Sequence, residues 1–213
     1  VLFGLATGAV ASLFVIYASH YLGLADKVPH IALPMTLAMA LGMPLWLRVM
    51  QRVEKHRAWT LAAVGMIAAL SVVPALEPGA SSLRPMIAIM ACFGFFLGLS
   101  SIALPSLLAD IVDYDVWRNR QDRAAIFFSF QSVVTKLNQG VGGAIALAIP
   151  AWFGFEPQGE ITPSAALGLK LAFVAWPCSL LVPMLLLAWR YPLGRRAHAI
   201  LARRLATRQE IQA

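Results

Sequence analysis

The sequence predicts an all-α membrane protein, in which six transmembrane helices form one bundle over residues 1–190 and a basic tail covers residues 191–213. Three observations support this prediction. The chain of 213 residues is 60% hydrophobic and 13% charged, whereas about a quarter of the residues of a soluble domain are charged. Six apolar stretches have about the 20 residues that a helix needs to cross a bilayer. The basic residues gather in alternate connections between these stretches.

The six spans follow one another with short polar or turn-forming connections. Their expected boundaries are residues 1–22, 30–50, 57–77, 85–108, 124–153 and 167–190. Several prolines lie within them, and a membrane bundle accommodates prolines because neighbouring helices satisfy the freed backbone groups. Two Gly-x-x-x-Gly pairs, Gly4 with Gly8 and Gly94 with Gly98, predict close approaches of helices. The chain begins at Val1 inside the first apolar run, and we expect this start to be a cut.

The placement of Lys and Arg predicts the orientation. Thirteen of the 17 would lie on one side of the membrane, in the connection after the second span, the connection after the fourth span, and the tail: Arg48, Arg52, Lys55, Arg57, Arg118, Arg120, Arg123, Arg190, Arg195, Arg196, Arg203, Arg204 and Arg208. The other side holds Lys27 and Arg84. The positive-inside rule therefore places the aspartate-rich connection and the C-terminus in the cytoplasm of a multi-pass protein of the cell (inner or plasma) membrane.

The distribution of charge and the absence of known catalytic motifs argue against a nucleic-acid-binding protein and an enzyme. The net charge of +7 follows from this topology and requires no nucleic-acid partner. The tail is either a short helix lying on anionic lipid or a solvated basic segment. The sequence has no H-E-x-x-H, G-x-S-x-G or P-loop motif, and Cys92 and Cys178 lie inside apolar runs. We therefore expect no enzyme activity and no cofactor.

Lys136 is the most informative residue of the spans. It lies 12 residues into the fifth span, which corresponds to a depth of about 18 Å in a bilayer core of about 30 Å. A charge at that depth costs a few kcal/mol and marks a cavity, an ion partner or a substrate path. None of the six spans offers an acid at mid-depth, so a structural partner for Lys136 would come from another chain or a missing segment. Lys170 lies near the outer boundary, where its side chain can reach water.

Polar and small residues gather on one side of the same helix. At 100° per residue, most of them occupy an arc of about 160°, and apolar residues cover the rest. The predicted lining of a hydrophilic cavity comprises Gln131, Ser132, Thr135, Lys136, Asn138 and Gln139.

A mixed-charge segment follows the fourth span. It reads ADIVDYDVWRNRQDR and holds four aspartates and three arginines from Ala109 to Arg123. This segment and the fifth span resemble the glycoside–pentoside–hexuronide:cation symporter family, the melibiose permease-like branch of the major facilitator superfamily. The marks are the ADIVDY box, Trp117, Phe128-Ser129, Lys136-Leu137 and the glycines after them. The turn LGMPLWLRVMQRVEKHRAW is also similar to one of the family.

The resemblance implies a fold and roles for particular residues. The chain would be the C-terminal half of a major-facilitator fold, and the N-terminal six-helix bundle would be a missing partner. Lys136, with Gln131 and Ser132 near it, would line the cavity for a sugar and its coupling cation. Asp110 and Asp113, with Tyr114, Arg118 and Arg123, would form a cytoplasmic gate in the loop between the fourth and fifth spans. Asp115 and Asp122 depart from the family pattern, which leaves the pairing within this gate open.

The expected function is therefore cation-coupled symport, with H⁺ or Na⁺, of a sugar or glycoside by alternating access. Two alternatives remain. The same fold could carry a lysolipid or an anionic organic solute, since a lysine in the cavity tolerates negative cargo. The chain could also be a truncated relic or a partner subunit without transport of its own.

Overall fold

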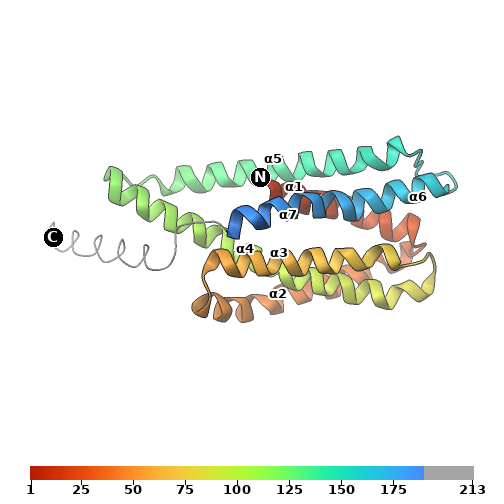
Figure 1. The fold of residues 1–213 in the computed structure, drawn as a ribbon, viewed down its shortest axis with the longest axis horizontal. Helices are drawn as coiled ribbons and strands as arrows, with labels where there is room; N and C mark the ends of the chain where they lie inside the picture. Colours follow the sequence, from red (N-terminus) through yellow and green to blue (C-terminus); the bar gives the residue numbers. More distant parts are fainter. Residues whose placement is uncertain (190–213) are drawn as a thin grey trace.

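A computed structural model of the protein describes residues 1–189, and every element in this range is helical. The expected basic tail, residues 191–213, lies outside the described residues. The α-helices are α1 (Leu2–Ile16), α2 (Val28–Arg52), α3 (Lys55–Val72), α4 (Leu83–Asn119), α5 (Ala124–Trp152), α6 (Pro163–Lys170) and α7 (Trp176–Trp189). They run roughly along the long axis of the molecule (Figure 1).

Two π-helical turns extend or join these helices. The segment η1 (Tyr17–Tyr21) continues α1, and η5 (Leu171–Ala175) joins α6 to α7. Three short 3₁₀ segments, η2 (Ala25–Lys27), η3 (Val73–Ala75) and η4 (Ala80–Ser82), lie in the connections at one end of the bundle. Because the π turns keep the helical path unbroken, α1 with η1 forms one long rod, and α6, η5 and α7 form another.

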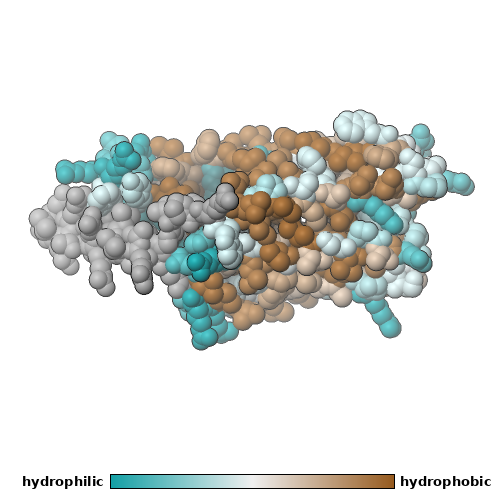
Figure 2. Space-filling view, viewed as in Figure 1, coloured by the Kyte–Doolittle hydropathy of each residue, from teal (hydrophilic) through white to brown (hydrophobic). Residues whose placement is uncertain are grey.

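The surface composition is that of a membrane protein. Five helical segments are long and apolar enough to cross a bilayer: Leu2–Tyr21, Ala25–Arg52, Lys55–Ala75, Ala80–Asn119 and Pro163–Trp189. Figure 2 shows apolar residues across the middle of one face and hydrophilic residues toward its two ends. This distribution fits a bundle whose middle faces hydrocarbon and whose ends face water.

The helix α5 is less apolar than the five segments above. Its 29 residues are enough for a bilayer, but Gln131, Lys136, Asn138 and Gln139 lower its mean hydropathy, and it is not among the five apolar segments. The membrane crossing expected at 124–153 therefore stays a prediction. It is supported by the packing of α5 lengthwise on α1.

Both Gly-x-x-x-Gly pairs lie where helices touch. A Cβ at Gly8 would collide with the backbone of Gln139, and one at Gly142 would collide with the backbone of Leu5. On the other pair, a Cβ at Gly98 would lie 2.6 Å from the carbonyl oxygen of Met39. The close contacts predicted at Gly4/Gly8 and Gly94/Gly98 are confirmed: the first joins α1 to α5, and the second joins α4 to α2.

The aspartate-rich segment is helical, so the prediction of a loop from Ala109 onward was wrong. The helix α4 continues to Asn119, and only residues 120–123 connect it to α5. Residues 109–119 contain no Gly or Pro to stop a helix, and Arg120 ends it in the left-handed conformation, with φ 57°. Its 37 residues span about 55 Å, so the end of α4 and the start of α5 project beyond the neighbouring helices (Figure 1).

The glycine contact between α1 and α5 predicts a selective loss of stability. Gly8→Ala should lower the free energy of unfolding by about 1–3 kcal/mol, because the new methyl group forces two backbones apart. The matched control is Gly140→Ala on α5, since a Cβ there meets nothing within 4 Å; it should leave stability unchanged or raise it by about 0.5–1 kcal/mol. Thermal unfolding in detergent would measure both, and equal effects of the two substitutions would contradict the packing.

Candidate functional site

The helix α5 presents three faces of different chemistry. One face packs on α1 and carries the buried residues Gly142, Gly143 and Ala146. A second face is exposed and polar, and we call it the polar strip: Ser132, Lys136 and Gln139. A third face is exposed and apolar, with Phe130 at 70%, Val133 at 56%, Leu137 at 63% and Val141 at 51% relative exposure.

The geometry of the polar strip follows from helix periodicity. Residues three and four apart lie above one another on a helix, so Ser132, Lys136 and Gln139 form one continuous row. At 100° per residue, the centre of the apolar row lies about 140° around the same helix from the centre of the polar strip, and its nearest member, Val133, lies about 60° from Lys136. An exposed polar row and an exposed apolar row on one helix require two different surroundings. Hydrocarbon suits the apolar row, and an aqueous space or a polar partner suits the polar strip.

The other expected cavity residues lie elsewhere. Thr135 and Asn138 are half-buried, and both face α1: a Cβ placed on Gly4 would lie 2.9 Å from the Cβ of Asn138 and 3.6 Å from the carbonyl oxygen of Thr135. Gln131, also half-buried, lines an apolar crevice next to α4. The structure thus brings three of the six predicted residues into the polar strip and places the other three at its edges.

Among residues 1–189, Lys136 pairs with no carboxylate. Its side chain is exposed, and within residues 1–189 it takes part in none of the hydrogen bonds or ion pairs. The polar strip therefore carries one uncompensated positive charge. In the same range, no group of three His, Cys, Asp or Glu could hold a metal ion.

Charged residues gather at the end of the bundle where α4 extends beyond it. We call this group the charge cluster: Lys55, Asp110, Asp113, Asp115, Arg118, Asp122 and Arg123. The ammonium group of Lys55, at the start of α3, donates to both carboxylate oxygens of Asp110 at 2.7 Å and to the carbonyl oxygen of Ser106 at 3.3 Å. About a quarter of each charged side chain is exposed, so this pair is partly shielded from water. It ties the α2–α3 turn to α4.

A second pair fixes the short connection between α4 and α5. The guanidinium of Arg123 donates twice to the carboxylate of Asp115, at 2.9 and 3.1 Å. Asn119 donates to the same carboxylate at 2.6 Å. Asp122 accepts from the backbone N–H of Ala124 at 3.0 Å and so satisfies one free donor of the first turn of α5. Two-point pairing of this kind restricts orientation as well as distance.

The remaining expected gate residues project from the same helical end. Asp113, Tyr114 and Arg118 are exposed, and the Tyr114 ring lies 6.0 Å from that of Trp117. Sequence reasoning missed Lys55, because its partner Asp110 is 55 residues away and no local spacing relates the two. It treated Asp115 only as a departure from a pattern, although Asp115 is the carboxylate that Arg123 binds. The eight-residue spacing of Asp115 and Arg123 across a tight turn was the available signal.

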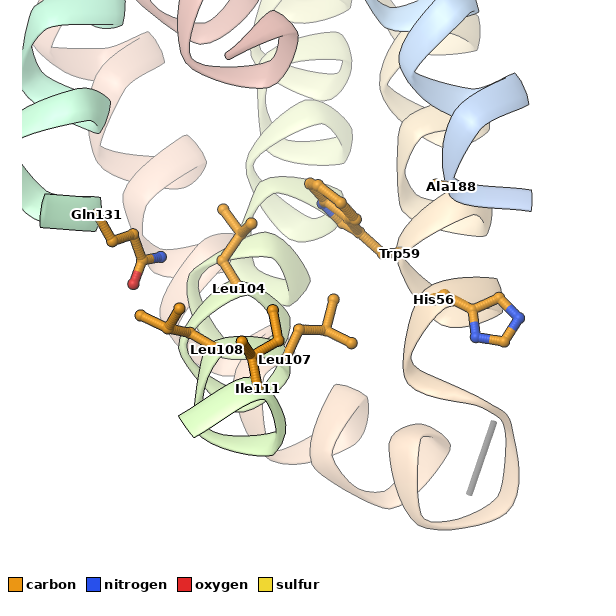
Figure 3. A pocket seen from close by; sticks show the side chains of 8 residues that line it. All are labelled: His56, Trp59, Leu104, Leu107, Leu108, Ile111, Gln131 and Ala188. Atoms are coloured by element: carbon orange, nitrogen blue, oxygen red, sulfur yellow. The ribbon is translucent and has the colours of Figure 1, made fainter. Parts of the chain in front are cut away.

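An apolar crevice separates the helices at this end. It has a volume of about 280 Å³ and is lined by His56, Trp59, Leu104, Leu107, Leu108, Ile111, Gln131 and Ala188. Figure 3 shows that α3, α4, α5 and the last turn of α7 each contribute to it, with Gln131 reaching in from α5. The indole N–H of Trp59 donates to the hydroxyl of Ser100 at 3.1 Å. The four helices are therefore less closely packed here than α1 is on α5.

Residues 1–195 match the family described as MFS/sugar transport protein. The chain belongs to this family. Its members are transporters, so the protein is a multi-pass membrane protein of a class that moves small molecules. The resemblance to sugar symporters of the major facilitator superfamily, drawn from the ADIVDY box and Lys136, is confirmed at this level.

Individual relatives agree with the family. The chain is 26% identical over 214 aligned positions to an uncharacterized symporter of Synechocystis sp., covering 97% of this chain and 39% of the relative. It is 26% identical to the uncharacterized symporter YjmB of Bacillus subtilis, over 44% of this chain and 21% of the relative. It is 23% identical to a glucuronide carrier protein homolog of Escherichia coli, over 54% of this chain and 25% of the relative. The chain therefore spans less than half the length of these relatives.

The Lys55–Asp110 pair predicts a measurable coupling. Lys55→Gln and Asp110→Asn should each destabilise the protein, and the double variant should lose about 1 kcal/mol less than the sum of the two. A denaturant-unfolding cycle on the four proteins would measure this difference. Lys27→Gln combined with Asp110→Asn is the control and should be additive, because Lys27 lies outside this contact. An additive Lys55/Asp110 cycle would contradict the pairing.

Proposed function

We propose that this chain is the C-terminal bundle of a cation-coupled sugar symporter, which works by alternating access together with an N-terminal six-helix bundle. The observation that carries the proposal is the polar strip of α5. It is exposed, it contains a lysine that pairs with no carboxylate within residues 1–189, and it lies beside a separate apolar face. A substrate path between two bundles would give such a strip the polar surroundings that lipid cannot.

The path would run along the polar strip, with Lys136, Ser132 and Gln139 in contact with the substrate. Thr135, Asn138 and Gln131 would shape its edges. The coupling ion would be H⁺ or Na⁺, and its acidic ligands would come from the other bundle, because the six spans of this chain provide none at mid-depth. The relatives named symporter support coupled transport, since they share this part of the chain.

A sugar acid is the substrate variant that the charge favours. A positive charge on a substrate path gains most from a carboxylate placed against it, and one relative is named a glucuronide carrier homolog. A neutral glycoside would offer hydroxyl groups to Ser132 and Gln139 and leave Lys136 unneutralised. A hexuronide is therefore the preferred cargo within the sugar class, and other anionic solutes are the second candidate.

The charge cluster would serve as the cytoplasmic gate. Asp110, Asp113, Tyr114, Arg118 and Arg123 lie on the projecting end of α4 and its connection to α5, where a second bundle could reach them. Ion pairs at such a mouth can form and break as two bundles rock. The Asp115–Arg123 and Lys55–Asp110 pairs would be the contacts that these residues make within this bundle when the mouth is open. The C-terminus would be cytoplasmic, and the protein would reside in the cell membrane.

The proposed role of Lys136 predicts a substrate-dependent loss of transport. In the complete transporter, Lys136→Ala should abolish coupled uptake of a glucuronide, at least about 100-fold in kcat/KM, because a desolvated carboxylate loses its partner. Uptake of a neutral glycoside, if the wild type carries one, should fall less. Radiolabelled uptake into vesicles would measure both.

Lys27→Ala is the matched control, since Lys27 is exposed in a connection at the opposite end of the bundle from the charge cluster. It should transport like the wild type. Near-normal uptake by the Lys136→Ala transporter would remove the basis of the proposal.

A further inference from the structure

Lys170 makes two contacts that a lysine reaching only for water would not make. Its ammonium group donates to the carbonyl oxygen of Pro74 at 3.2 Å, and it lies 5.3 Å from the centre of the Tyr21 ring. Pro74 belongs to η3 at the end of α3, and Tyr21 ends η1 after α1. One side chain from α6 thus touches the ends of two other helices.

Both contacts are electrostatically favourable. The last carbonyls of a helix lack intrahelical partners and carry partial negative charge, so a cation at this position satisfies a helix end. The face of a tyrosine ring also attracts a cation. Lys170 is half-buried, and its contact with Pro74 is exposed. Lys170 acts as a cap that the sequence of α3 does not itself supply.

The two π-helical turns pack directly beside this cap. Tyr17 of η1 stacks on Phe173 of η5, with ring centres 4.7 Å apart and an interplanar angle of 14°. Both side chains are fully buried, and Tyr17 also lies 4.9 Å from Tyr21. A π turn inserts one extra residue into a helix and is frequently found at functional sites. Here two such turns face each other and share one aromatic contact.

Further contacts join the same end of the bundle. The backbone N–H of Gly79 donates to the carbonyl oxygen of Leu22 at 3.0 Å, and the His20 ring lies edge-on to Phe155 at 5.7 Å. The opposite end holds the apolar crevice of about 280 Å³ between α3, α4, α5 and α7 (Figure 3). A hollow of about 580 Å³ also lies at the Lys170 end, and its lining includes His20, Tyr21 and Gly79. The contacts of Lys170 and of the aromatic rings therefore join the helix ends around this hollow.

We propose that Lys170 is a positioning residue for transport: from α6 it joins the ends of α1 and α3 into one rigid body around the Tyr17–Phe173 stack, so that this end of the bundle keeps its shape during transport. The part of this inference that concerns transport rests on the proposed function. The rigid body does not, and it can be tested without any substrate.

Hydrogen–deuterium exchange of the complete protein tests the rigid body. Lys170→Met should raise amide exchange about tenfold or more in residues 17–27 and 72–80, because local opening becomes easier when the joining contacts are lost. Exchange in residues 109–123, at the far end, should not change. Lys170→Arg keeps a cation and should stay close to the wild type, and Lys27→Met is the matched control.

Two further variants separate this role from a general loss of stability. Tyr21→Leu removes only the ring contact and should raise exchange in the same segments by a smaller factor. Lys170→Met should lower the maximal uptake rate without changing KM, since Lys170 lies away from the polar strip. Unchanged exchange in 17–27 and 72–80, or an equal rise throughout the chain, would overturn the inference even if transport were confirmed.

Discussion

The close contact between α1 and α5 is the constraint on which the rest of the structure depends. Gly8 and Gly142 remove the side chains between the two helices, so that backbone lies on backbone. This contact fixes the rotation of α5 about its own axis. With the glycine face held against α1, this rotation sets which surroundings the Lys136 row and the Leu137 row each meet. A turn of about 100° would exchange their surroundings and place a charge in hydrocarbon.

The two ends of the bundle are held by different interactions. At one end, carboxylates pair with cations in partly exposed positions, as in Lys55–Asp110 and Asp115–Arg123. Such pairs are individually weak and easily exchanged for other partners. At the other end, buried aromatic rings and one capping lysine make the contacts. This asymmetry suits a bundle that must form and break charge contacts at one mouth while its other end keeps its shape.

The sequence predicted the positions of the long helices well, because runs of apolar residues with polar breaks directly reflect hydropathy. It also predicted both glycine contacts, since small residues four apart let membrane helices approach closely. The prediction failed at the aspartate-rich segment, where we expected a loop because the segment gathers charges that are scarce in the rest of this apolar chain. Charge alone does not end a helix, and neither Gly nor Pro occurs between Ala109 and Asn119.

The candidate site was predicted only in part, for a physical reason. A helical wheel gives the angle of each side chain but not the position of the neighbouring helix. Thr135 and Asn138 share the polar arc with Lys136, yet α1 covers them and leaves Lys136 exposed. The pairing of Lys55 with Asp110 joins separate helices, and nothing in either local sequence specifies it. From the sequence we expected Lys170 only to reach water. Its contacts with Pro74 and Tyr21 depend on tertiary packing, which the local sequence does not specify.

The most direct measurement is thiol labelling of the two exposed rows of α5 in the complete transporter, with Cys92 and Cys178 replaced by serine. Single cysteines would stand at Ser132, Lys136, Gln139 and Leu137, and a charged, water-soluble reagent would report which of them face water. The account predicts labelling at the first three positions, reduced by transported substrate, and none at Leu137, which faces lipid. Labelling at Leu137, or an unreactive polar strip, would contradict it.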